Sequence, residues 1–139
     1  MSYKNVLGGN STLRIYSASI ILGLLALIPH TILAQEMVFT QAKCTVVYSL
    51  ERSDYRYFNH EIVQLSVLIN QKDIHFIDLN NWGKTPPHVG ISGRLRRKLR
   101  QQYALKKGVS QAVLVNDQGD ILNRYNGSVI LVNALIDCR

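Results

Sequence analysis

Residues 17–34 contain no charged side chain, and this uncharged run decides which part of the chain can fold into a globular domain. The run is rich in Leu and Ile, ends in alanine, and follows two basic residues, Lys4 and Arg14, with no acid before it. A basic start, an apolar centre and a small residue at the end are typical of a secretory signal. We therefore predict that residues 1–34 are a signal peptide and that the domain comprises residues 35–139.

Two other interpretations of the uncharged run stay open. The first is a retained membrane anchor, although its 18 residues fall just short of the roughly 20 that cross a bilayer as a helix. Pro29 and His30 shorten the apolar part further, which favours a cleaved signal. The second is a buried helix of the domain itself. A signal or an anchor predicts export to the periplasm or the extracellular space, or retention at the inner membrane.

The composition of residues 35–139 is typical of one globular domain with a basic bias. The segment keeps 14 of the 16 Lys and Arg and all nine Asp and Glu, so its net charge is +5. It has no internal repeat and no low-complexity run. A chain of this length buries enough apolar surface to fold alone.

Hydrophobic periodicity predicts the element order β-α-β-α-β-β-α. Short β-branched and aromatic runs indicate strands, and Phe58, Ile62, Leu65 and Ile69 recur at the spacing of a helical face. Asp54, Ser92 and Ser128 are suitable helix caps, and Gly108 suits a helix end. The predicted strands are 45–50, 74–79, 112–116 and 120–125, and the predicted helices are 54–70, 93–107 and 129–138.

This order restricts the topology to few choices. The turn residues 116–119 join the last two strands as an antiparallel hairpin. A helical crossover joins the first two strands, which are therefore parallel, and such crossovers are right-handed. The result is a single α/β domain with a mixed four-stranded sheet in the order 2-1-3-4 and helices on both faces. This arrangement is similar to the core of the thioredoxin fold.

The redox residues of thioredoxins are missing from the equivalent places. The first strand places their Cys-x-x-Cys motif on Ser53-Asp54-Tyr55-Arg56, which contains no cysteine. Their proline at the start of the third strand falls at Gln111 or its neighbour. The resemblance therefore implies the fold without the redox chemistry.

A closer resemblance rests on longer stretches of the chain. They are Ser53–Tyr57, Leu99–Tyr103, Ala112–Gly119 and the segment from Arg124 to Asp137. In these stretches the chain resembles a family of uncharacterised thioredoxin-like domains, which occurs in bacterial exported proteins and in animal extracellular sushi-repeat proteins. The resemblance spans residues 44–139, and it implies no catalytic residue and no cofactor.

The two cysteines, Cys44 and Cys138, are predicted to form a disulfide. An even number of cysteines in an exported protein favours pairing. The topology also places the start of the first strand and the end of the last helix at the same end of the sheet. The alternative is a reactive thiol at either cysteine, as a peroxiredoxin-like or thiol-dependent antioxidant enzyme would need.

The predicted helix 93–107 concentrates the positive charge of the domain. Outside it the domain carries a net charge of −2. A solvated helix face is one interpretation, and a contact surface for an anionic envelope or an acidic protein is another; nucleic acid is disfavoured because aromatic residues are scarce there. The basic residues are Arg94, Arg96, Arg97, Lys98, Arg100, Lys106 and Lys107.

The loop 80–93 and the segment 53–56 complete the candidate contact surface. Trp82 in this loop is interpreted either as an apolar plug beneath the loop, which we favour, or as an anchor for a partner. His60, His75 and His88 are too scattered for metal-ligand spacing, so no metal site is predicted.

The resulting hypothesis is an exported, non-catalytic interaction module. Its candidate contact residues are Ser53, Asp54, Arg56, Trp82, Arg94, Arg96, Arg97, Lys98 and Arg100. The alternatives are the thiol enzyme and a subunit of an envelope or DNA-transfer assembly.

Overall fold

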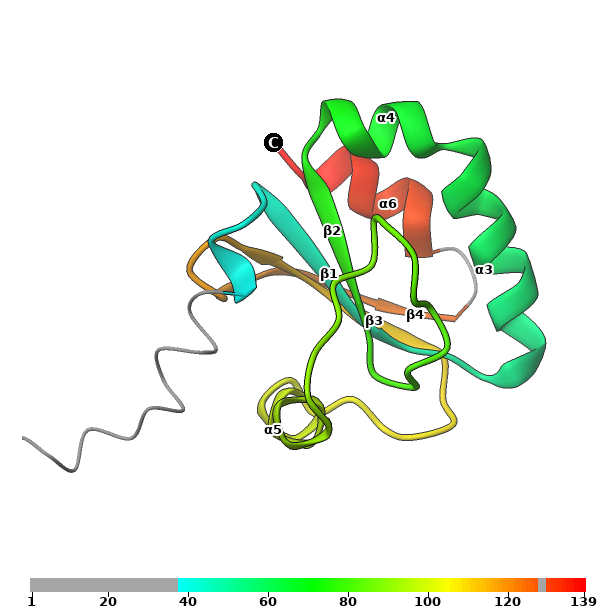
Figure 1. The fold of residues 1–139 in the computed structure, drawn as a ribbon, viewed down its shortest axis with the longest axis vertical. Coiled ribbons are helices and arrows are strands. Elements are labelled where there is room, and N and C mark those ends of the chain that lie inside the picture. The colour runs from blue at the N-terminus through cyan, green and yellow to red at the C-terminus, as the bar shows by residue number, and fades with distance from the viewer. Residues whose placement is uncertain (1–37, 128–129) are drawn as a thin grey trace, which may run out of the picture. The chain divides into compact units, whose positions relative to one another are not determined.

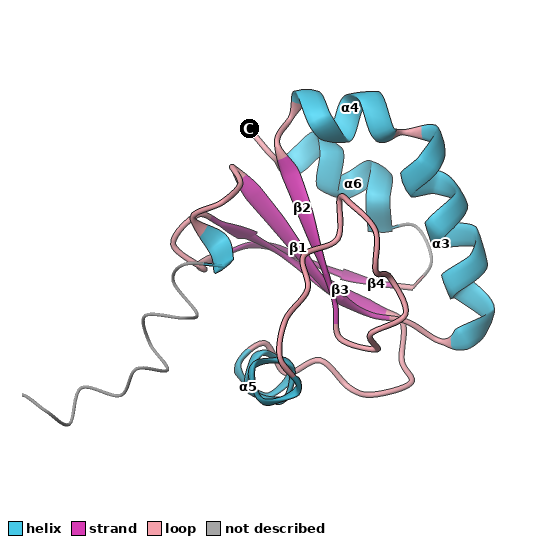
Figure 2. Ribbon diagram, viewed as in Figure 1, coloured by secondary structure: helices cyan, strands magenta, loops and turns pink. Residues whose placement is uncertain are grey.

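A mixed four-stranded sheet separates the helices of the domain into two layers (Figures 1 and 2). The computed structural model describes residues 38–127 and 130–139. The strands are β1 (Cys44–Ser49), β2 (Ile74–Asp78), β3 (Gln111–Asn116) and β4 (Ile121–Asn126). The helices are α3 (Arg52–Gln64), α4 (Ser66–Gln71), α5 (Gly93–Gln102) and α6 (Ile130–Asp137).

The sheet confirms the predicted α/β topology. Its strands lie in the order β2-β1-β3-β4, with β1 parallel to β2 and antiparallel to β3, and β3–β4 form the hairpin. In Figure 1, α5 lies on one face of the sheet, whereas α3, α4 and α6 lie on the other. This is the three-layer arrangement expected of a thioredoxin-like domain.

Each face of the sheet carries its own apolar core, because successive strand side chains point to opposite sides. Val46 and Tyr48 of β1 face α3, α4 and α6, whereas Val47 faces α5. The α5 core also contains Phe39, whose ring meets that of Tyr103 edge-on at 6.3 Å. Phe39 precedes every predicted element, and its place in the core was not expected from the sequence.

The first helical segment differs from its prediction in both bounds. The sequence predicts one helix over 54–70, but α3 begins at Arg52 and ends at Gln64, and α4 follows after Leu65. Leu65 has φ −98° and ψ 13°, which breaks the helix while its side chain still packs against the core. The apolar spacing therefore continues across a break in the backbone.

The end predicted for α5 is also wrong. The helix ends at Gln102 and not near Gly108, because Ala104 adopts a left-handed φ of 53°. The Leu105 N–H then donates to the Arg100 carbonyl at 3.0 Å, a helix-ending pattern more often built on glycine. Leu105 turns into the α5 core, where it is buried, and its burial explains the early end.

Several predictions fall on residues that the structure does not describe. The signal peptide 1–34 and the cap Ser128 lie outside the described residues, as does Val129, where the last helix was predicted to start. None of the helices in residues 38–127 and 130–139 has the length and apolar character of a membrane span.

Candidate functional site

The buried carboxylate of Asp78 organises the loop that follows β2. Asp78 is 5% exposed, and its Oδ1 accepts the Asn80 N–H at 2.7 Å. Its Oδ2 accepts the N–H groups of Trp82 and Gly83, both at 2.7 Å. A buried charge is tolerated only when it is hydrogen-bonded in this way. The three bonds fix the backbone on both sides of Trp82.

His88 fastens the far end of the same loop to β1. Its Nδ1 lies 2.9 Å from the Thr85 carbonyl, and its Nε2 lies 2.8 Å from the Tyr48 hydroxyl. Because a carbonyl only accepts, Nδ1 carries the proton, and Nε2 of the neutral ring accepts from Tyr48. Burial lowers the pKa of His88, which favours this neutral form. Burial also raises the pKa of Tyr48, with the charge of Asp78 adding to the effect, so its hydroxyl stays a donor.

Gly83 allows the loop to pass directly over the His88 ring. A Cβ at this position would lie 2.5 Å from Nε2 of His88, closer than any side chain tolerates. Glycine is therefore required here by the close approach of backbone to ring.

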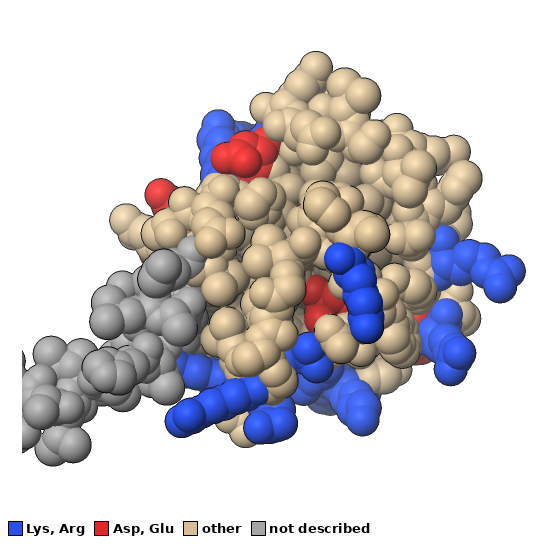
Figure 3. All heavy atoms as spheres, in the orientation of Figure 1, with Lys and Arg blue, Asp and Glu red and all other residues tan. Residues whose placement is uncertain are grey.

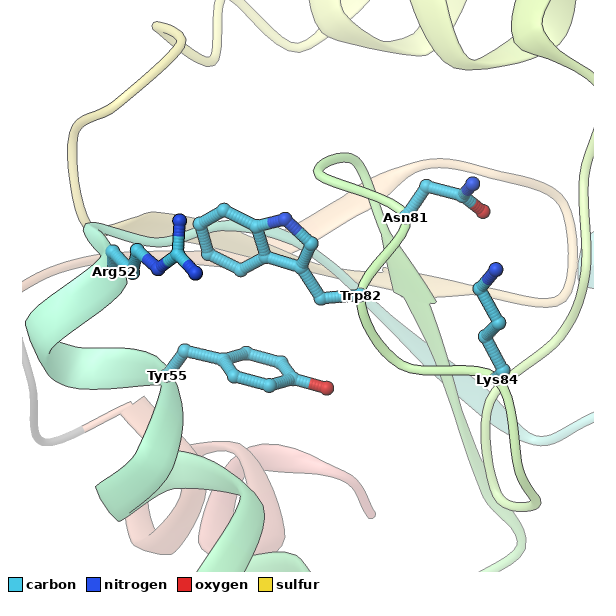
Figure 4. Close-up of a pocket in the computed structure, with 5 residues that line it drawn as sticks. All are labelled: Arg52, Tyr55, Asn81, Trp82 and Lys84. Atoms are coloured by element: carbon cyan, nitrogen blue, oxygen red, sulfur yellow. The ribbon is translucent and has the colours of Figure 1, made fainter.

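Trp82 is presented to solvent by this fixed loop. Its side chain is 40% exposed, so the interpretation of Trp82 as a plug beneath the loop is wrong. The indole meets the Tyr55 ring of α3 edge-on, at 5.2 Å and 72° between planes. Figure 4 shows Arg52 and Tyr55 reaching the indole from α3, while Asn81 and Lys84 extend from the loop. Asp78 therefore binds the backbone N–H of Trp82, while the Trp82 side chain remains exposed to solvent.

Three adjoining open hollows surround Trp82, and all three include it in their lining. The largest, of about 600 Å³, lies between the end of β2 and α5. A second, of about 440 Å³, lies between α3 and the loop, and a third includes Ser53. The basic side chains that line the hollows are Arg52, Lys84, Arg96, Arg97, Arg100 and Lys107. In Figure 3 the basic side chains gather at the end of the molecule where α5 lies.

Arg100 has a structural task in addition to lining the largest hollow. Its Nη2 donates to the Leu79 carbonyl at 3.0 Å, and its Nη1 donates to Ser49 Oγ at 3.1 Å. Burial, followed by the nearby charge of Arg96, lowers the pKa of Arg100. Arg100 therefore joins α5 to the ends of β1 and β2 and is not a freely moving surface cation.

The other predicted basic residues differ in their placement. Arg96 lines the hollow with one amino group donating to the Ile91 carbonyl at 3.3 Å, and its Nε is buried without a hydrogen-bond partner among the described residues. Arg97 lines the hollow and is exposed. Arg94 and Lys98 belong to α5 but are not part of the hollow's lining.

The predicted contact residues of the segment 53–56 also differ in where they lie. Ser53 is exposed and lines a hollow with Trp82, whereas Arg56 is exposed and lines none of the three. Asp54 does not cap the helix as predicted, because Glu51 holds the capping position. Asp54 Oδ2 instead accepts the Ser110 hydroxyl at 2.5 Å, and so ties α3 to the segment before β3.

The two cysteines lie at the other end of β1, and their predicted pairing is confirmed. Cys44 and Cys138 form a disulfide with 6.1 Å between Cα atoms, and both are buried. Lys72 reinforces this end, since its Nζ donates to the Cys138 carbonyl at 3.0 Å. The bond leaves no free thiol.

Sequence reasoning missed the residues that hold the site together. The sequence places Tyr48 and Asp78 only within predicted strands, and His88 only among histidines too scattered for a metal site. The available signal was an acid at the end of a buried strand, followed by Asn-Asn-Trp-Gly, since a buried acid needs nearby backbone donors. Among the described residues, no group of three or more His, Cys, Asp or Glu could hold a metal ion.

Comparison with known proteins adds no family to this description. No model of a known protein family matches the chain, and no curated protein is similar to it.

Proposed function

We propose that this protein is an exported, non-catalytic interaction module that docks an acidic partner through the surface around Trp82. This Trp82 surface consists of the exposed aromatic and the cations and polar groups beside it. Its members are Arg52, Ser53, Tyr55, Trp82, Lys84, Arg96, Arg97 and Lys107.

One observation carries the proposal: Trp82 is exposed although its backbone is rigidly held. Asp78 binds the N–H of Trp82 itself, and His88 anchors the loop to β1. Binding hot spots are enriched in Trp and Arg, and a fixed conformation lowers the entropy lost when a partner binds. The hollows beside the indole are lined by six basic side chains and one acid, Glu51, so the surface suits a partner whose apolar contact is surrounded by acids.

Export is part of this proposal and rests on the uncharged run before the domain. The buried disulfide supports it, because disulfides persist in oxidising compartments. The thioredoxin-like family that the sequence resembles has the same setting. The thiol-enzyme alternative has less support, since Cys44 is bonded, 1% exposed and at the opposite end of β1 from Trp82.

The experiment is retention of the purified protein on immobilised poly-L-glutamate, measured over a range of salt concentrations. Two double variants make the same charge change on the same basic segment. Arg97→Glu with Lys107→Glu alters the hollow beside Trp82, whereas Arg94→Glu with Lys98→Glu alters cations outside it. We expect the first pair to lose about tenfold or more in affinity and the second to lose much less.

Trp82→Ala should also weaken retention on poly-L-glutamate, because the indole supplies the apolar contact of the docking surface. Equal losses in the two charge-reversed pairs, with no effect of Trp82→Ala, would mean that the protein binds by net charge alone. That result would contradict a defined contact surface.

A further inference from the structure

The largest hollow beside Trp82 has the properties of a site for a small, multiply charged anion. It lies between the end of β2 and α5, has a volume of about 600 Å³, and is lined by Arg96, Arg97, Arg100 and Lys107. The described residues that line it include no acid. Its size is within the range typical of small-molecule sites.

One guanidinium group that lines this hollow, that of Arg100, is already fixed in place. Arg100 is held by the Leu79 carbonyl and the Ser49 hydroxyl, so it does not lose side-chain freedom when an anion arrives. A preorganised cation of this kind binds an anion more tightly than a mobile lysine does.

No acid of α5 offsets the positive charge around Arg100, although the buried carboxylate of Asp78 acts on it from β2. Arg96 precedes it by four residues on the same face, and like charges at this spacing repel each other. The Nε of Arg96 is buried without a partner among the described residues, although its neighbouring amino group is bonded. An anion between the two guanidinium groups would relieve this repulsion.

Trp82 adds an aromatic surface to the hollow, with which an inorganic anion alone makes no stacking contact. Its indole lines the same hollow as the four cations and is 40% exposed, so a flat group attached to the anion has a ring to stack on. A carboxylate carries one charge, whereas a diphosphate carries two or more and suits paired guanidinium groups.

We infer that the hollow between the end of β2 and α5 binds a soluble phosphate ester that carries a planar ring. The phosphates lie against Arg96, Arg97, Arg100 and Lys107, and the ring lies on Trp82. The inference goes beyond the proposed function, because it assigns a small ligand to a surface otherwise expected to dock an acidic partner.

Trp82 is the single tryptophan of the chain, so intrinsic fluorescence reports on this hollow directly. The experiment titrates the purified protein with ADP, with inorganic pyrophosphate and with adenosine. We expect ADP to quench the fluorescence, pyrophosphate to compete with ADP at about tenfold lower affinity, and adenosine to bind more weakly still.

Arg97→Glu should reduce the ADP affinity by about tenfold or more, whereas Arg94→Glu, on the same helix but outside the hollow, should leave it nearly unchanged. Equal effects of the two variants would overturn the inference. So would binding to phosphatidylglycerol vesicles without any response to ADP or pyrophosphate, because the phosphate source would then be a membrane.

Failure of this inference differs from failure of the proposed function. If ADP and pyrophosphate do not bind while poly-L-glutamate retention still depends on Arg97, Lys107 and Trp82, the small ligand is excluded and the docking surface stands. If the phosphates bind but retention does not depend on these residues, the reverse holds.

Discussion

The two ends of β1 are held together by different means, and the difference separates stability from recognition. At the Cys44 end, a buried disulfide and the bond from Lys72 to Cys138 fix the last helix to the sheet. At the other end, hydrogen bonds to Asp78 and His88 fix a loop whose tryptophan stays exposed. The disulfide at the first end stabilises the fold, whereas the hydrogen bonds at the second end hold a loop that presents an exposed side chain.

The two faces of the sheet show a related contrast. The α5 helix carries five basic residues and no acid, whereas α4 carries no charge and exposes Val67 and Leu68. Figure 3 shows basic side chains gathered at the end where α5 lies. Positive charge is therefore densest where the loop presents Trp82, whereas the helix layer opposite carries both signs, with Arg52, Asp54, Arg56 and Glu61 on α3 and Asp137 on α6.

The largest effect is expected at the disulfide end. Replacing Cys44 and Cys138 together by serine should lower the free energy of unfolding by about 4 kcal/mol, because the bond closes a loop of 94 residues. Urea denaturation measures the loss. Retention of the folded variant on poly-L-glutamate should be unchanged, and a parallel loss of retention would show that the two ends are not independent.

A smaller loss is expected at the recognition end from Asp78→Asn. The amide replaces a charged acceptor of three backbone N–H groups, which should lower the free energy of unfolding by about 3 kcal/mol. Asp73→Asn is the matched control, since Asp73 is exposed and bonds the Lys43 N–H at the other end. A similar loss in both variants would argue against a special role for the buried carboxylate.

Gly83→Ala tests the contact between the loop and the His88 ring. The added methyl would lie 2.5 Å from Nε2 of His88, so we expect a destabilisation of about 1–3 kcal/mol and weaker poly-L-glutamate retention. Gly90→Ala provides the control, because no atom lies within 4 Å of a Cβ at that position. Equal stability of the two variants would contradict the close packing of the loop.

The smallest effect is the pH dependence that His88 contributes. Its pKa is lowered in the folded protein, so below pH 6.5 the unfolded chain binds a proton more readily than the folded one. The stabilisation is therefore complete above this pH and is lost as the pH falls below it. Comparing urea denaturation of the protein with that of His88→Gln between pH 5 and 8 measures the difference. If His88→Gln loses as much free energy of unfolding at low pH as the unaltered protein does, other groups cause that loss.

Local sequence signals were sufficient to predict the fold, one helix cap and the disulfide. Short β-branched and aromatic runs predicted the strands, and Ser92 caps α5 as expected, its hydroxyl accepting the Leu95 N–H at 3.2 Å. The disulfide followed from topology, because the direction of each element places Cys44 and Cys138 at one end. These features depend on neighbours in sequence or on the handedness of connections.

The candidate site was only partly predictable because it depends on contacts between distant segments. The basic helix and the loop 80–93 were recognised, but Tyr48 and His88 are 40 residues apart and Asp54 bonds to a serine 56 residues away. The backbone conformation at Trp82 depends on the bonds of Asp78, which no periodicity reveals. Arg100 was expected on the surface, yet the Leu79 carbonyl and the Ser49 hydroxyl hold it.

Protection of Trp82 from quenching tests the central claim most directly. The acrylamide quenching of the single tryptophan would be measured with and without poly-L-glutamate, for the unaltered protein and for the two charge-reversed pairs. If the Trp82 surface is the docking site, poly-L-glutamate should protect the indole in the unaltered protein and in Arg94→Glu with Lys98→Glu. It should not protect it in Arg97→Glu with Lys107→Glu. Bound poly-L-glutamate that leaves the quenching of Trp82 unchanged would contradict the account.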